Sequence, residues 1–202
     1  LVSYLPRVYQ LRTMNRTKPI EITLCSGTFE QYITSRREDG TPFDCAFKVT
    51  KQFDPTGDLN KHKIIDLDLD SIANKKLENG FYQLSINVPP ENEEGKGPGS
   101  FIRYLAITDT ALTLKLDDAN KLLVWATDMK TGEVAPNLSL QILAGGKKLK
   151  GTTDKDGLAT FDIPVVANER TVSVSAFGNS HAGVATMDWN DGIGAWNYNL
   201  QQ

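Results

Sequence analysis

The sequence predicts an all-β protein built from two consecutive antiparallel β-sandwich domains of the Ig-like or fibronectin-like kind. Apolar and polar residues alternate with a period of two almost throughout, and helical patterns are scarce. Clusters of Gly, Asn, Asp and Pro interrupt the alternation roughly every 8 to 15 residues. Period-two alternation lets one face of a strand be buried while the other stays in water. Short strands of this kind between turn-forming clusters are typical of sandwiches.

The clearest strand is residues 81–88, in which Tyr82, Leu84, Ile86 and Val88 alternate with polar residues. The same alternation predicts further strands at 20–24, 47–50, 64–69, 101–108, 111–116, 122–127, 138–143, 158–161, 172–177 and 182–187. The best helical candidate is short and covers residues 68–76, "DLDSIANKK".

In the strand at 122–127, both faces carry apolar residues, so alternation alone does not say which face is buried. We expect Val124 and Ala126 to fill it, which leaves Trp125 at an interface or partly exposed.

The domain boundary is expected near Asp109. The stretch 89–100, "PPENEEGKGPGS", contains no large apolar residue, but it lies between two alternating strands and so resembles a long hairpin loop. The boundary therefore follows the returning strand and gives domains 1–109 and 110–202, the second ending in a connector. Interfaces between domains of one chain are usually modest, so we expect an elongated monomer.

Composition excludes several classes of function. Hydrophobic residues make up 40% of the chain and charged residues 23%, as in soluble globular proteins. The net charge of -3, with scattered Lys and Arg, offers no basic surface to nucleic acid. No run approaches the roughly 20 apolar residues of a membrane span, so we expect membrane contact only through an anchor outside this fragment. The chain begins "LVSYLPRVYQL", without Met or a signal-peptide pattern, which indicates a piece of a longer chain.

Two aspartate-rich stretches look like calcium loops but fail the ligand count. In "TTDKDGLATFDIP", Asp154 and Asp156 would fill loop positions 1 and 3, but Leu158 and Val165 occupy positions 5 and 12. In "DLDLDSIANKKL", which begins at residue 66, Ser71 replaces the required glycine and Leu77 the terminal glutamate. We expect a tight turn at 154–157 and no metal at either place, since Asp bonds nearby backbone and glycine accepts positive φ.

No other pattern indicates catalysis. His62 and His181 have no Cys, Ser or carboxylate at motif spacing, so we expect solvated loop residues. The sequence has no nucleophile elbow, phosphate-binding loop or Cys-x-x-Cys pair. We therefore expect no catalytic residue, no cofactor and no enzyme activity.

The two cysteines, Cys25 and Cys45, lie 20 positions apart. Read from the residues alone, a disulfide and two buried thiols are equal alternatives.

A longer pattern carries a family resemblance. The stretch "FIRYLAITDTALTLKLDDANKLLVWATDMKTGEVAPNLSLQILAGGKKLKGTTDKDGLATFDIP" preserves the order and spacing of several short motifs. It resembles the macroglobulin-like domains of bacterial alpha-2-macroglobulins over about residues 80–188. The first half resembles a preceding macroglobulin domain mainly through "GFYQLSINV".

The resemblance implies a scaffold segment of a protease trap that inhibits endopeptidases of broad range in the periplasm or cell envelope. Such a trap is cut at an exposed bait and captures the protease through a thioester, which needs a glutamine three residues after a cysteine. Gln31 follows Cys25 by six positions, so Cys25 is not carried over as that nucleophile. The partners implied are neighbouring domains, and proteases only through the full-length protein. An envelope location favours the Cys25–Cys45 disulfide.

Two other functions remain as alternatives. The same sandwiches would serve as spacers in an Ig-like adhesin or stalk of the cell envelope, in which case the full-length gene would lack a bait and a thioester motif. Alternatively, Trp189, Trp196 and Tyr198 would form an aromatic platform for carbohydrate. We expect these three aromatic residues instead to pack against the next domain as a connector.

Overall fold

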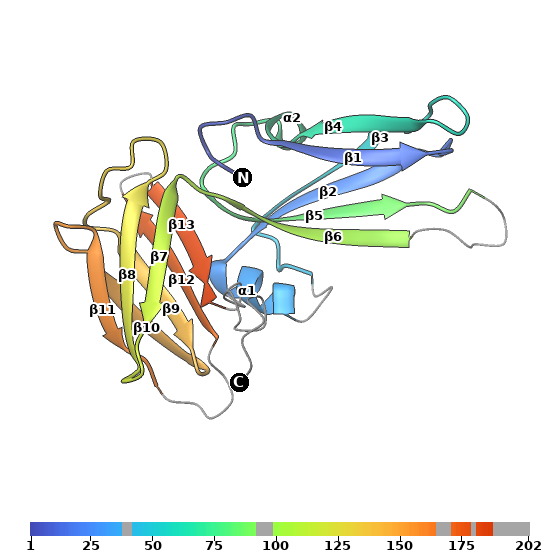
Figure 1. Ribbon diagram of the computed structural model, residues 1–202. Coiled ribbons are helices and arrows are strands. Elements are labelled where there is room, and N and C mark those ends of the chain that lie inside the picture. Colours follow the sequence, from blue (N-terminus) through green and yellow to red (C-terminus); the bar gives the residue numbers. More distant parts are fainter. Residues whose placement is uncertain (38–41, 92–98, 165–170, 179–180, 188–202) are drawn as a thin grey trace, which may run out of the picture. The chain divides into compact units, whose positions relative to one another are not determined.

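The computed structural model describes residues 1–37, 42–91, 99–164, 171–178 and 181–187 and divides into two compact units, Leu1–Asp109 and Thr110–Gln202 (Figure 1). Both units consist mainly of strands, and the predicted all-β fold is confirmed.

The first unit contains two antiparallel sheets of unequal size. The larger has the order β3-β2-β5-β6, and the smaller pairs β1 with β4. Two helices, α1 (Phe29–Arg37) and α2 (Leu69–Ala73), complete the unit. The strands are β1 (Val8–Met14), β2 (Ile20–Gly27), β3 (Phe47–Phe53), β4 (His62–Asp68), β5 (Gly80–Val88) and β6 (Gly99–Ile107).

The core of the first unit lies between its two sheets. Alternation on β2 and β5 turns Leu24 and Leu84, both fully buried, toward Leu67 of β4 and Leu69 of α2. The opposite face of the larger sheet is covered by α1, where the ring of Tyr32 lies 4.9 Å from that of Phe81. Helix α1 therefore covers part of one face of the larger sheet, and the smaller sheet covers part of the other.

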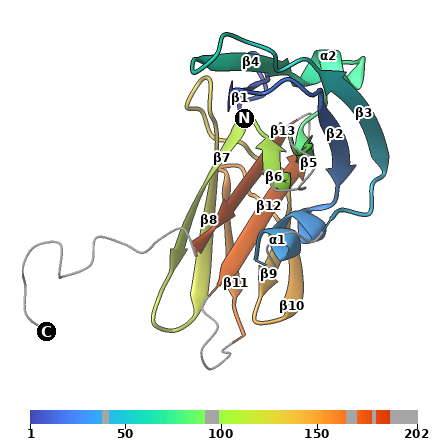
Figure 2. The same cartoon turned by 90° about the vertical axis from the view of Figure 1, so that its right-hand side faces the viewer.

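The second unit is a sandwich formed by a sheet that folds over itself. Its strands have the order β10-β9-β12-β13-β7-β8-β11, and the step from β13 to β7 is one parallel pair, Gly183 with Thr110. The strands form two layers (Figures 1 and 2). Buried side chains of β8, β9 and β12 form one core between them. The strands are β7 (Thr110–Leu116), β8 (Lys121–Asp128), β9 (Ser139–Ala144), β10 (Lys147–Thr152), β11 (Leu158–Asp162), β12 (Val172–Gly178) and β13 (His181–Thr186).

The orientation expected for β8 is confirmed. Val124 and Ala126 are fully buried, whereas 43% of Trp125 is exposed.

Three elements were not predicted from the sequence: β1, β10 and α1. The strand expected to run to residue 69 ends one residue earlier, because Asp68 caps α2 there. The expectation that both histidines lie in loops was wrong. His62 is the exposed first residue of β4, and His181 is the half-buried first residue of β13.

Candidate functional site

The stretch at 154–158 forms a turn stabilised by backbone hydrogen bonds. The Asp154 carboxylate accepts from the backbone N–H groups of Asp156 at 2.9 Å and Leu158 at 2.8 Å. Gly157 has φ +74° and donates its N–H to the Asp154 carbonyl at 3.1 Å. Oδ1 of Asp154 therefore closes the turn, which is the structural role predicted for this stretch.

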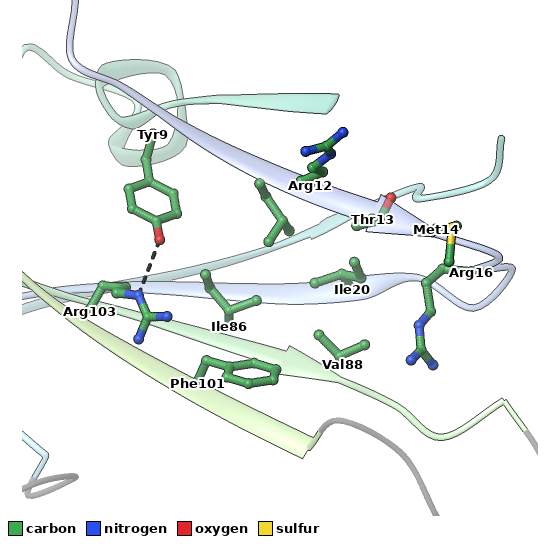
Figure 3. Close-up of a pocket in the computed structure, with 11 residues that line it drawn as sticks. Tyr9, Arg12, Thr13, Met14, Arg16, Ile20, Ile86, Val88, Phe101 and Arg103 are labelled. Atoms are coloured by element: carbon green, nitrogen blue, oxygen red, sulfur yellow. Dashed lines mark hydrogen bonds between the residues drawn. The ribbon is translucent and has the colours of Figure 1, made fainter. Parts of the chain in front are cut away.

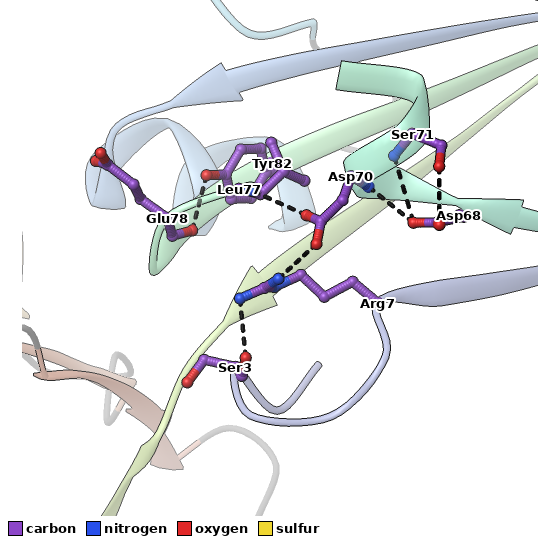
Figure 4. A network of polar contacts seen from close by, with 8 residues as sticks. All are labelled: Ser3, Arg7, Asp68, Asp70, Ser71, Leu77, Glu78 and Tyr82. Carbon is purple, nitrogen blue, oxygen red and sulfur yellow. Dashed lines mark hydrogen bonds and ion pairs between the residues drawn. The ribbon is translucent and has the colours of Figure 1, made fainter. Parts of the chain in front are cut away.

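The aspartates near residue 70 hold the N-terminal segment against α2 (Figure 4). Asp68 is the N-cap of α2, and the bond from the Ser71 hydroxyl, at 2.9 Å, is the main cause that lowers the Asp68 pKa. Asp70 pairs with the buried Arg7 at 2.7 Å and accepts from the Leu77 N–H at 2.8 Å. These carboxylates have structural partners, and the described part of the chain contains no group of three His, Cys, Asp or Glu side chains able to hold a metal ion.

Cys25 and Cys45 form a disulfide, with their Cα atoms 5.4 Å apart. Gln31 belongs to a capping box at the start of α1. Its Oε1 accepts from the Thr28 N–H at 2.8 Å, and its own N–H donates to Thr28 Oγ1 at 3.2 Å. The cysteine and the glutamine that come closest to a thioester pattern thus have separate structural roles.

His181 lies beside a tight turn rather than in solvent. Its Nδ1 is 3.8 Å from Oδ2 of Asp128. The Asp128 pKa is held below its usual value first by the backbone N–H groups of Thr131 and Lys130, and only to a smaller degree by His181. Asp128 therefore shapes the turn that follows β8, and the histidine adds to its electrostatic environment.

A groove with a volume of about 330 Å³ lies between β1 and the β5–β6 hairpin and is a candidate binding site (Figure 3). Its apolar floor comes from Ile20, Ile86 and Val88, all buried. At one end, Arg103 Nε on β6 donates to the Tyr9 hydroxyl on β1 at 3.3 Å. Met14, 47% exposed, lies at the other end, and Phe101, 39% exposed, borders the floor between the two ends (Figure 3).

Three guanidinium groups line this groove. Within the described residues, the Arg12 guanidinium group makes no hydrogen bond or ion pair, and the Arg103 guanidinium group bonds only the Tyr9 hydroxyl and the Ile102 carbonyl. Arg16 lies 3.9 Å from Glu91, the one carboxylate of the described chain within ion-pair distance of the three. Glu91 is already bonded by the Thr17 hydroxyl at 2.6 Å. The groove therefore combines an apolar floor with a positive border.

The groove also contains an unsatisfied hydroxyl. Thr13 of β1 is 8% exposed, and its Oγ1 has no hydrogen-bond partner in the described part of the chain. A buried polar atom without a partner costs free energy, so a ligand that bonds it would recover that loss. This groove was not predicted from the sequence.

Several predicted features lie outside the described residues. These are the carbohydrate-platform residues Trp189, Trp196 and Tyr198, and most of the 89–100 loop, whose residues 92–98 are not described. No helix within the described ranges is both long and apolar enough to cross a membrane.

Comparison with known families gives a match within the second unit and the end of β6. Residues 107–202 match the family model described as the bacterial alpha-2-macroglobulin MG3 domain. Among curated proteins, no significant match was found.

Two similar solved structures extend the comparison to both units. A crystal structure of native alpha-2-macroglobulin from Escherichia coli spanning domains NIE-MG1 aligns with a TM-score of 0.64 and 11% identity, covering 89% of this chain and 88% of that one. A longer structure of the E. coli protein, spanning MG0-NIE-MG1, gives a TM-score of 0.64 and 14% identity over 91% of this chain and 59% of that one. At such identities the alignments establish a shared fold.

A structure of a 1.5-MDa bacterial ice-binding adhesin aligns over 89% of this chain and 56% of that one, with 10% identity and a TM-score of only 0.30. This score carries no argument for the adhesin alternative.

Proposed function

We propose that this chain is a segment of a bacterial alpha-2-macroglobulin, that its second unit is an MG3 domain, and that the segment is a non-catalytic scaffold of a protease trap. The match over residues 107–202 is the observation that carries the proposal. In this role the two sandwiches support neighbouring domains, and proteases meet the chain only as part of the full-length protein. We further propose a periplasmic or cell-envelope location, where a disulfide such as Cys25–Cys45 persists.

The contacts of several polar residues favour a structural rather than a chemical role for this chain. The carboxylates of Asp68, Asp70 and Asp154 bond backbone N–H groups of their own turns. Cys25 is joined to Cys45, so its sulfur is not present as the free thiolate that nucleophilic chemistry requires. We place the reactive bond and the bait of the proposed trap in other parts of the full-length protein.

The test compares the 202-residue chain with the full-length protein, each incubated with the same set of endopeptidases. Two readouts are needed: turnover of a large protein substrate beside a small peptide substrate, and conjugates that survive denaturation and reduction. We expect the full-length protein to slow only the large substrate and to form conjugates, and the 202-residue chain to do neither.

A Gln31→Glu variant of the 202-residue chain is the matched control. It removes the glutamine of the incomplete thioester pattern, and the proposal expects it to behave as the parent chain does. Conjugates formed by the parent chain but lost in this variant would overturn the scaffold proposal. An inactive full-length protein would contradict the trap itself.

A further inference from the structure

The groove in the first unit exists because its two sheets differ in strand number. Two strands, β1 and β4, lie over a sheet of four. Neighbouring strands are about 4.8 Å apart, so roughly 10 Å of the larger sheet extends beyond the smaller one. On the β3 side α2 covers part of this excess, and the Lys51 ammonium on β3 bonds the Ser71 carbonyl of α2 there. The β6 side has no such cover among the described residues.

The core-facing side of β6 is covered at one end of the strand and exposed at the other. Its residues 101, 103, 105 and 107 pair with Ile86, Leu84, Tyr82 and Gly80 of β5, so they share the face that elsewhere forms the core. Ile107 is fully buried and Leu105 packs against the core, yet Phe101 is 39% exposed and Arg103 is also exposed. The inner face is therefore open to solvent beside the end of the strand that carries Phe101.

Backbone hydrogen-bonding capacity is also available there. Within the described residues, β1 pairs only with β4, and β6 pairs only with β5. Each therefore has an edge with no neighbouring strand, although on β6 the N-terminal ammonium group of Leu1 bonds the Ala106 carbonyl at 2.7 Å. The groove lies between these two strands (Figure 3).

We propose that this groove accepts an extended peptide segment of a partner protein, which adds to the smaller sheet as a third strand beside β1. The segment alternates apolar and acidic side chains. Its apolar side chains lie on Ile86, Val88 and Phe101, and its carboxylates pair with Arg12 and Arg16 on the border. Strand addition gives affinity through backbone bonds, and the alternating side chains give selectivity.

Charge decides between an acidic and a basic segment. The three arginines of the groove have only Glu91 as a nearby carboxylate in the described chain, although the whole chain carries a net charge of -3. A positive site on an acidic protein selects against basic segments and favours acidic ones. This inference does not depend on the proposed function, since it concerns the 202-residue chain alone.

The experiment titrates the 202-residue chain into fluorescein-labelled peptides and follows fluorescence anisotropy. The probes are a heptapeptide of alternating Val and Glu, the same peptide with Lys in place of Glu, and the same peptide with Ser in place of Val. We expect the Val–Glu peptide to bind at least about tenfold more tightly than either control, which corresponds to about 1.4 kcal/mol.

Two variants place the binding in the groove. Arg12→Gln should weaken the Val–Glu complex about fivefold, or about 1 kcal/mol, as expected for a partly exposed ion pair. Phe101→Asp should weaken it further by setting a negative charge on the floor. The matched controls are Lys147→Gln in β10 and Leu59→Asp at a residue that is 79% exposed. Neither substitution should change the affinity for the Val–Glu peptide.

Thermal unfolding of each variant separates lost binding from lost folding, and Arg12→Gln, on the surface, remains informative if Phe101→Asp unfolds. Equal binding of the three peptides, or no binding of the Val–Glu peptide, overturns the proposal. Binding of dodecanoate without binding of any peptide would also overturn it and indicate a lipid. Dimerisation of the chain that requires Phe101 would overturn it in favour of a second copy.

Discussion

Gly157→Ala should destabilise the second unit by more than the conformational penalty of placing an alanine at positive φ. Gly157 has φ +74°, a conformation that costs an alanine roughly 1–2 kcal/mol. A Cβ atom there would lie 2.6 Å from the backbone oxygen of Ala126, well inside the roughly 3.3 Å at which carbon and oxygen ordinarily touch. That oxygen accepts from the Ala135 N–H, and the Gly157 carbonyl accepts from the Ala126 N–H, both at 2.9 Å.

The clash cannot be relieved by a side-chain movement, because the atom contacted belongs to the backbone of β8. Shifting it weakens at least one of the two hydrogen bonds, at about 1 kcal/mol each, in addition to the strain of overpacking, about 1–3 kcal/mol. The total is about 3 kcal/mol or more. For a unit of this size, that lowers the melting temperature by roughly 12 °C or more.

Gly132→Ala is the matched control. Gly132 has φ +76°, and a Cβ there would meet no atom within 4 Å. This substitution carries the same conformational penalty without the clash, so it should cost only about 1–2 kcal/mol.

The assay is urea unfolding followed by tryptophan fluorescence, which reports the second unit because all three tryptophans follow residue 110. Equal midpoints for Gly157→Ala and Gly132→Ala would refute the packing argument. Each protein is also measured with calcium and with a chelator. A midpoint raised by calcium would show that Asp154 and Asp156 bind metal after all.

Three further predictions concern other contacts. Thr153→Val should cost about 1–3 kcal/mol in the same assay, because the buried hydroxyl accepts from one backbone N–H at 2.9 Å and donates to a carbonyl at 3.0 Å; an unchanged midpoint would contradict this. The unreduced chain treated with a thiol label should gain no mass, and two labelled thiols would exclude the disulfide. Cys45→Ser should destabilise the first unit by about 3 kcal/mol. The pKa of Asp68 is lowered in the folded state, so its contribution to stability is present above the pKa of the unfolded carboxyl group and is lost as pH falls through the pKa of the folded one. Hydrogen exchange of the α2 amides should therefore depend less on acid in Asp68→Asn than in the parent chain. Identical pH profiles of exchange in the two proteins would argue against the cap.

Most strands of the fold follow from the sequence because their buried faces are marked by regular alternation. The three missed elements lack that mark, each for its own reason. In β10, "KKLKGT", only Leu149 turns an apolar side chain inward, and the strand lies at the edge of its sheet. Helix α1 was detectable, since Thr28 and Gln31 have the spacing of a capping box and Phe29, Tyr32 and Ile33 have the spacing of one helical face.

The third missed element, β1, is directly related to the groove. Its inward residues are Tyr9, Leu11 and Thr13, and the hydroxyl of the third breaks the apolar pattern that would have marked a strand. That hydroxyl lies near the end of the smaller sheet and is buried without a hydrogen-bond partner among the described residues. The Thr13 hydroxyl, which hid β1 from the prediction, is therefore also a group that could bond a partner in the groove.

The groove itself could not have been read from the sequence, because alternation shows which face of a strand points inward and not whether anything covers that face. Phe101, Arg103, Leu105 and Ile107 form one regular series, which predicts a strand whether or not a second layer lies over it. Coverage depends on how many strands each sheet recruits, and that is decided by contacts between residues far apart in the chain, such as those pairing β1 with β4. The one local sign was Arg103, a charge among inward-facing positions. A long charged side chain is tolerated there only when its end reaches water, so an inward-facing arginine near the end of an edge strand indicates a layer that stops short.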